Sequence, residues 1–269
     1  MTTKSIHNQS RWDDYGKKRY KELKRTPQSF ILNKSPLDKI PYFRKIFGLV
    51  VPDIRRLRVL ELGCGTGDVA VYLAQHGAKV VAVDIGRDLV FSTKALSKVN
   101  GVEIDCRVAS ATRLPFKGDT FTHVIGIALL HHLSPEDLRE AVAEAKRVLR
   151  AGGYLLCNEP VEDSKLFDFV QNLLPVSSRS GNPRPSIIQR EKWKSYKKNI
   201  DERALSTREI KNAFRGFSEV KFFHNGLFGR LDRFFPNLTN FFMRLDSWTL
   251  SMLPFLKRYS RNLVICAKK

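Results

Sequence analysis

The sequence predicts an α/β fold with a mostly parallel sheet and helices on both of its faces. Three observations support this class. Short apolar runs alternate with amphipathic runs between residues 57 and 160, a glycine-rich turn (ELGCGTG) joins one such pair, and the next apolar run (KVVAVDI) ends in an acid. Chains with this alternation form parallel sheets whose ligands lie beyond the carboxyl ends of the strands.

Apolar runs bounded by turn residues predict the individual strands. They cover about 57–62, 79–84, 103–108, 122–127 and 153–158, and later runs at 220–224 and 262–268 predict the last two strands. A helix is expected over 135–150, because Ser134 precedes it, a proline and two acids form its first turn, and two glycines follow it. The capping box that begins at Ser206 predicts a further helix.

The glycine-rich turn lies between the first strand and a helix. Gly63, Gly65 and Gly67 alternate with other residues. Glycine allows positive φ and lets a ligand approach the backbone closely. Glu61 at the strand tip suits a ligand with an amino group better than a polyphosphate. A dinucleotide dehydrogenase is a minor interpretation, because its third glycine would come later, as G-x-G-x-x-G.

An acid also ends the second strand. Asp84 follows Gly67 by 17 residues. A carboxylate at this tip accepts hydrogen bonds from ribose hydroxyls, so a nucleoside ligand is expected. The alternative is that Asp84 only caps the next helix.

With these motifs in order, the chain resembles the class I S-adenosylmethionine-dependent methyltransferases, specifically the small-molecule branch of the ubiquinone and menaquinone C-methyltransferases. The matching segments are VLELGCGTG (59–67), VVAVDI (80–85), LPFKGDTFTHVIG (114–126), LLHHL (129–133) and VLRAGGYLLCNEP (148–160). The resemblance implies a Rossmann-like, seven-stranded sheet with an antiparallel last strand. It also implies S-adenosyl-L-methionine as the cofactor.

The resemblance further implies roles for individual residues. The glycine loop would hold the methionine half of the cofactor, Asp84 the ribose, and Glu61 would lie near the amino group. Where the family usually has an acid near adenine, this chain has Ser110, so the Ser110 hydroxyl or the Ala111 amide would contact adenine more weakly. The expected cofactor-binding residues are Glu61, Gly63, Cys64, Gly65, Thr66, Gly67, Asp84, Ile85, Ser110, Ala111 and Ile127.

The candidate general base is His132 or His131, just past the fourth strand, and Glu159 at the fifth strand tip is another candidate. Imidazole titrates near neutrality and can accept a proton there. In relatives a histidine at this position often has a structural role, and Glu159 could instead bind a substrate hydroxyl or cap a turn. No metal site is expected. The chain lacks the Asp/Asn-Pro-Pro-aromatic motif of enzymes that methylate exocyclic amines of nucleic acids.

The predicted organisation is a single methyltransferase domain over 1–269. Its expected parts are an N-terminal helical cap (1–45), a cofactor-binding core (46–160), a basic substrate-side segment with the sixth strand (161–224), an amphipathic helical insertion (225–261) and the last strand (262–269). Net charge is +20 and lies on the flanks. Residues 1–58 carry 15 Lys/Arg and 5 Asp/Glu, 59–163 carry 11 and 14, and 164–269 carry 21 and 8. Basic flanks attract anionic partners.

The insertion is rich in aromatic residues bordered by Arg and Lys and is broken by Pro236 and Pro254. We expect two short amphipathic helices, apolar on all sides. They would either pack on the core or form a lid that contacts an anionic membrane.

Three functions remain open from the sequence. The first is methyl transfer to a small-molecule or lipid-like acceptor, at oxygen or carbon. The second is RNA methylation, in which the basic flanks would bind phosphates. The missing Asp/Asn-Pro-Pro-aromatic motif argues against methylation of exocyclic amines. The third is a non-catalytic cofactor-binding protein. The sequence shows no apolar leader and no apolar run of 18 residues, so we expect a cytoplasmic protein that is at most membrane-peripheral. The cysteines have no paired spacing, so we expect them to be reduced. The sequence predicts no oligomeric state.

Overall fold

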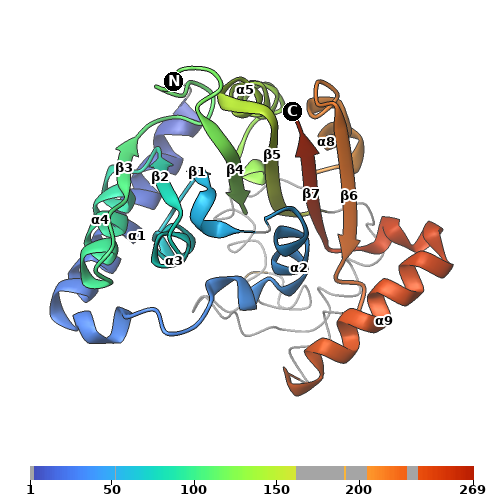
Figure 1. Cartoon of the computed structure of the whole chain (residues 1–269), viewed down its shortest axis with the longest axis horizontal. Coiled ribbons are helices and arrows are strands. Elements are labelled where there is room, and N and C mark those ends of the chain that lie inside the picture. The colour runs from blue at the N-terminus through green and yellow to red at the C-terminus, as the bar shows by residue number, and fades with distance from the viewer. Residues whose placement is uncertain (1–2, 52, 162–190, 192–204, 229–235) are drawn as a thin grey trace. The chain divides into compact units, whose positions relative to one another are not determined.

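The computed structural model of the chain describes residues 3–51, 53–161, 191, 205–228 and 236–269 (Figure 1). The chain divides into two compact units. The first comprises Met1–Glu159, Glu209–Phe223 and Leu263–Lys269, and the second comprises Pro160–Arg208 and His224–Asn262. Much of the predicted basic substrate-side segment (161–224), namely residues 162–190 and 192–204, lies outside the described residues.

A seven-stranded sheet in the order β3-β2-β1-β4-β5-β7-β6 organises the fold. Its first five strands pair in parallel, and β7 runs opposite to its neighbours (Figure 1). The predicted class, including the antiparallel last strand, is confirmed. The strands are β1 Arg58–Leu62, β2 Lys79–Asp84, β3 Asp105–Val108, β4 Phe121–Ile127, β5 Leu149–Pro160, β6 Glu219–Asn225 and β7 Asn262–Lys268.

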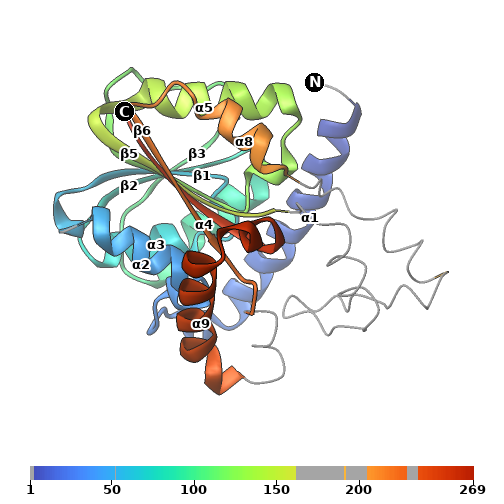
Figure 2. The same ribbon diagram turned by 90° about the vertical axis from the view of Figure 1, so that its right-hand side faces the viewer.

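Helices cover both faces of the sheet. Figure 2 shows α5 and α8 on one face and α2 and α3 on the other. Leu23 of α1, Val71 of α3 and Leu96 of α4 share one buried cluster, so α1 belongs to the layer of α3 and α4. The helices are α1 Thr3–Arg25, α2 Pro41–Val50, α3 Asp68–Gln75, α4 Arg87–Val99, α5 Pro135–Val148, α8 Thr207–Ala213 and α9 Thr239–Met252.

The capping signals worked as predicted at α5. The Ser134 hydroxyl accepts a hydrogen bond from the Asp137 amide, and Pro135 occupies the first turn. The C-terminal boundary was wrong, because α5 ends at Val148 and β5 begins at once. Leu149 pairs with Phe121, whereas the next β4 pair is His123 with Tyr154, so residues 150–153 form a bulge. The two glycines serve this bulge: a Cβ on Gly153 would lie 2.7 Å from the Thr122 carbonyl oxygen.

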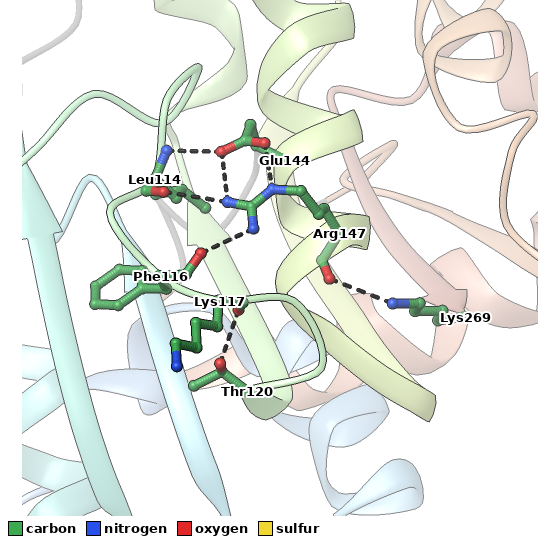
Figure 3. Close-up of polar contacts among 7 residues, drawn as sticks. All are labelled: Leu114, Phe116, Lys117, Thr120, Glu144, Arg147 and Lys269. Atoms are coloured by element: carbon green, nitrogen blue, oxygen red, sulfur yellow. Dashed lines mark hydrogen bonds and ion pairs between the residues drawn. The ribbon is translucent and has the colours of Figure 1, made fainter.

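Hydrogen bonds to an ion pair on α5, Glu144 with Arg147, hold the loop before β4 (Figure 3). Arg147 donates to the carbonyl oxygens of Phe116 (2.8 Å) and Leu114 (3.1 Å), and to Glu144. Glu144 in turn accepts from the Leu114 amide at 2.7 Å. The guanidinium lowers the pKa of Glu144 below its ordinary value. These bonds hold the backbone of residues 114–120, which belong to no helix or strand.

The described part of the insertion holds one α-helix, not two. Two 3₁₀ turns, η6 Pro236–Leu238 and η7 Pro254–Tyr259, flank α9. Each turn begins at a proline, which lacks the amide that a continuing helix would need. Apolar residues do lie on opposite sides of α9, because Phe242 and Leu250 are buried whereas Phe241, Trp248 and Met252 are exposed. None of the described helices is long and apolar enough to cross a membrane.

Candidate functional site

The glycine loop lies at the tip of β1 beside the tip of β2. The Cys64 amide donates to the Val83 carbonyl oxygen (3.0 Å) and the Gly67 amide to the Cys64 carbonyl oxygen (2.9 Å), so the chain turns tightly into α3. Gly63, Gly65 and Gly67 all have positive φ, at 63°, 53° and 82°. Left-handed backbone of this kind costs other residues about 1–2 kcal/mol. The three glycines are therefore required by the turn itself.

The three glycines have different surroundings, which indicate the side of the loop that a ligand can approach. A Cβ on Gly63 would lie 2.8 Å from Leu129 Cδ1, and one on Gly67 would lie 2.5 Å from Thr93 Cγ2. Nothing lies within 4 Å of a Cβ on Gly65. Gly63 and Gly67 are thus packed against protein, whereas Gly65 presents bare backbone to open space where a ligand can approach.

Asp84 joins the tips of the two strands. Its Oδ2 accepts from the Gly65 amide and its Oδ1 from the Gly86 amide, each at 2.9 Å. Burial raises the pKa of Asp84. Each carboxylate oxygen can accept a second hydrogen bond, so Asp84 can hold the loop and still receive a pair of hydroxyl groups. It does more than cap α4, because the bond to Gly65 reaches back to the first loop.

Glu61 is the least satisfied group at the site. Among the described residues no hydrogen-bond donor reaches its buried Oε2. Burial, and to a smaller extent the charge of Asp68, raises the pKa of Glu61 to about 8. A hydrogen bond from the Ala70 amide acts in the opposite direction and lowers this pKa. A cationic ligand would supply the missing partner and stabilise the ionised carboxylate. The site therefore fits a ligand that carries an ammonium or sulfonium group.

Thr93 belongs to the site although sequence reasoning missed it. Its hydroxyl donates to the Gly65 carbonyl oxygen at 3.1 Å and lies 3.6 Å from Cys64 Sγ. Thr93 is fully buried in α4. The one available signal was a pair of small polar residues, Ser92 and Thr93, on the inward side of a helix. Thr66, which was predicted, instead donates to Asp68 at 2.5 Å.

Helix α1 crosses the first turn of α4. A Cβ on Gly16 would lie 2.5 Å from backbone atoms of Asp88 and Leu89, so only glycine permits this crossing. Asp13 accepts from the Asp88 amide at 3.3 Å. The Trp12 ring of α1 packs edge to face against the His132 ring, with the ring centroids 5.3 Å apart. Trp12 therefore joins α1 to the segment after β4.

The three catalytic candidates meet in the turn after β4. Glu159 is fully buried, and its Oε1 accepts from the amides of Leu129 and Leu130, each at 2.9 Å. Its Oε2 lies 2.9 Å from Nδ1 of His131. When the Glu159 carboxylate accepts this hydrogen bond, Nδ1 is the donor, and in a neutral imidazole Nε2 of His131 is then the proton acceptor. The half-buried His132 ring packs beside that of His131, with centroids 4.0 Å apart.

The remaining predicted contacts occupy three strand ends. Ile127 is the last residue of β4, and Ile85 follows β2; both are half-buried. The Ser110 hydroxyl bonds to the Thr112 hydroxyl at 2.8 Å and accepts from the Thr112 amide at 3.2 Å. Ser110 is thus engaged in its own turn, and the half-buried Ala111 lies next to it.

Part of the chain matches a known family of proteins. Residues 59–153 match the family described as "Methyltransferase domain". The ubiquinone biosynthesis O-methyltransferase of Dinoroseobacter shibae is 31% identical over 111 residues, which is 41% of this chain and 44% of that protein. The ubiquinone/menaquinone biosynthesis C-methyltransferase UbiE of Desulfotalea psychrophila is 33% identical over 118 residues, covering 42% and 46%. The chain thus spans less than half the length of these curated relatives.

A solved structure agrees over a longer stretch. The S-adenosylmethionine-dependent methyltransferase from Mesorhizobium loti superimposes with a TM-score of 0.55 and 17% identity, covering 85% of this chain and 96% of that one. At this identity the likeness shows the fold alone.

Proposed function

We infer the function from the family: through residues 59–153 this chain belongs to the class I S-adenosylmethionine-dependent methyltransferases, and we propose that it methylates a small-molecule or lipid-like acceptor. One observation carries the proposal. The bare backbone at Gly65 and the unsatisfied carboxylate of Glu61 lie at adjoining strand tips with Asp84. Together they suit a cationic, ribose-bearing ligand.

The residues present fit S-adenosyl-L-methionine, the cofactor of this family. In the proposal Glu61 holds the amino group, the 63–67 loop holds the methionine half and Asp84 holds the ribose. The acids at 61, 68 and 84 also favour a positively charged ligand over an anionic one. When bound, the cofactor supplies a methyl group already activated by its sulfonium.

The chain's own residues then have to orient the acceptor and remove its proton. Alignment of two bound reactants can lower a barrier by about 7–11 kcal/mol. We assign His131 as the general base, because Glu159 fixes its tautomer with Nε2 free to accept a proton. Glu159 is then a positioning residue, since two backbone amides and His131 already occupy its oxygens. His132 and Trp12 would form a wall of the acceptor site.

The acceptor class rests on the relatives. The two curated relatives are named for ubiquinone or menaquinone biosynthesis, which favours a small, lipid-like acceptor methylated at oxygen or carbon. Four unpaired cysteines suit a reducing compartment, so we place the reaction in the cytoplasm.

RNA methylation is the second candidate, because the net charge of +20 lies outside the core. A single screen separates the candidates. Purified protein is incubated with methyl-labelled S-adenosylmethionine and, in turn, a lipid extract, a polar metabolite pool and total RNA. Label in the lipid or metabolite fraction supports the proposal, and label in RNA alone supports the second candidate. Cofactor binding without label in any fraction would instead indicate a non-catalytic protein.

A further inference from the structure

Large apolar side chains gather on the surface in one short segment of the chain. Eleven large hydrophobic residues are exposed among those described, and six of them lie between residues 238 and 255. The other five are scattered over separate elements. Isolated exposed apolar residues are ordinary, whereas a cluster marks a surface that binds something. The six clustered residues are Leu238, Phe241, Trp248, Met252, Leu253 and Phe255.

The cluster forms a stripe along α9 that continues into η7. Phe241, Trp248 and Met252 lie at intervals of seven and four residues, which places them on one helix face. They are 56%, 62% and 64% exposed. Phe255 in η7 extends the stripe and is 65% exposed. The opposite face is the buried one, with Phe242, Thr249 and Leu250, so the stripe is not the side by which α9 packs.

A buried carboxylate fixes this orientation. Asp246 is fully buried, and its two oxygens accept from the amides of Gly226 and Phe228, each at 2.7 Å. Rotating α9 to bury Trp248 would carry Asp246 away from both amides and expose Phe242. Leaving such amides without an acceptor costs about 1–3 kcal/mol each when they are buried. The outward position of the aromatic stripe is therefore enforced by the fold.

The charge around the stripe has one sign. Arg244 lies on α9 next to Phe241 and Trp248, and Lys257 and Arg258 follow Phe255; all three are exposed. The single acid between residues 236 and 261 is Asp246, which is buried. Aromatic rings bordered by exposed cations match the boundary between headgroups and acyl chains in an anionic membrane.

We propose that the α9–η7 face, defined by Phe241, Trp248, Met252 and Phe255 with Arg244, Lys257 and Arg258, docks on an anionic lipid surface. The aromatic residues enter the headgroup region, and the three cations neutralise lipid charge. This proposal does not depend on the methyl-transfer reaction. It requires only that the intact chain bind vesicles.

Vesicle flotation tests the proposal with the full chain. The probes are phosphatidylcholine vesicles with and without phosphatidylglycerol, at about 0.1 M and about 1 M salt, where the screening length falls from ~10 to ~3 Å. We expect binding to the anionic vesicles at low salt and markedly less binding to neutral vesicles or at high salt. Absence of binding to anionic vesicles at low salt would overturn the proposal.

Two sets of variants locate the surface. Trp248→Ser with Phe255→Ser should weaken partitioning by about tenfold or more, because less apolar area leaves water. Arg244→Glu with Lys257→Glu and Arg258→Glu should remove the preference for anionic lipid. The matched control, Leu49→Ser with Ile31→Ser, changes two exposed apolar residues elsewhere and should bind like the unmodified chain. Circular dichroism and S-adenosylmethionine binding check that each variant is folded.

The variants also distinguish other occupants of the face. If both α9–η7 variants bind vesicles normally, the proposal is wrong. Light scattering provides a second reading of the same proteins. The unmodified chain could prove to be a dimer that does not bind vesicles. If Trp248→Ser with Phe255→Ser then converts this dimer to a monomer, the face binds a second copy of the chain and the lipid assignment is overturned.

Discussion

The tips of β1 and β2 and the tips of β4 and β5 lie at the same edge of the sheet but are built by different means. At the first pair the backbone forms the site: three glycines with positive φ make the turn, and Gly65 leaves open space. At the second pair side chains form it: the buried Glu159 holds the backbone of residues 129–130 and the imidazole of His131.

This difference suits the β1–β2 tips and the β4–β5 tips to different tasks. A bare backbone bordered by acids can recognise a cationic ligand, and in the proposal that ligand engages both carboxylates, Glu61 and Asp84. An imidazole held by a buried carboxylate can accept a proton, but it contributes little to holding a nucleoside. Substitutions at β1 and β2 should therefore change cofactor affinity, and substitutions at β4 and β5 should change turnover.

The largest expected effect follows from His131→Asn. The amide nitrogen of Asn can still donate to Glu159, but the proton acceptor Nε2 is lost. We expect turnover to fall about 10²–10⁴-fold, with S-adenosylmethionine affinity nearly unchanged by calorimetry. The same measurement on His132→Asn should show a smaller loss. If the order of the two variants is reversed, His132 is the base and His131 has a structural role.

Gly65→Ala should reduce cofactor affinity by about tenfold or more, equivalent to ~1.4 kcal/mol. The new methyl group fills the open space and also adds the strain of positive φ. Gly101→Ala is the matched control, because Gly101 has φ +66° with nothing within 4 Å of its Cβ position but lies at the end of α4. Both variants should lose similar thermal stability. If both variants lose affinity equally, or if neither loses affinity, a ligand does not approach the loop at Gly65.

Glu61 should make both stability and cofactor binding depend on pH. Its pKa is about 8 in the folded chain against an ordinary value of 4.5. Between these values the folded state binds more protons than the unfolded state, so stability without cofactor falls as pH rises from about 4.5 to 8. A bound cation favours the ionised carboxylate, so affinity should rise over the same window, by at most about tenfold per pH unit.

Glu61→Gln is the control for this pH dependence. The variant keeps the shape of the side chain but cannot titrate, so its stability and affinity should vary less as pH rises from about 4.5 to 8, the range between the ordinary and the folded-state pKa of Glu61. Thermal unfolding and calorimetry over this range measure both quantities. A pH dependence identical to that of the unmodified chain would show that another group titrates.

Thr93→Val should have the smallest effect. Valine has nearly the same shape, but the hydrogen bond from the hydroxyl to the Gly65 carbonyl oxygen is lost. A single buried hydrogen bond contributes about 1 kcal/mol, so we expect stability to fall by about that amount and cofactor affinity to fall several-fold. Turnover at saturating cofactor should not change. A large loss of turnover would mean that Thr93 also supports the β4–β5 half of the site.

The sequence by itself predicted the alternation of strands and helices in the core and the residues at the tips of β1 and β2 that we propose for cofactor binding. Gly63, Gly65, Gly67 and Asp84 were identifiable because local backbone conformation and strand ends leave a direct pattern in the chain. Strand boundaries were predictable for β2 and β7 for the same reason. At β5 the local pattern failed, because Gly152 and Gly153 serve a bulge whose cause is pairing with β4.

Tertiary structure alone decided the features that join distant segments. No sequence pattern relates Thr93 to Gly65, Trp12 to His132 or Glu159 to His131, because these contacts arise only when separate elements meet. The same holds for α9, whose apolar residues are spread through the sequence of the insertion. The hydrogen bonds that the Gly226 and Phe228 amides donate to Asp246 hold α9 in the orientation that buries some of them and exposes the others.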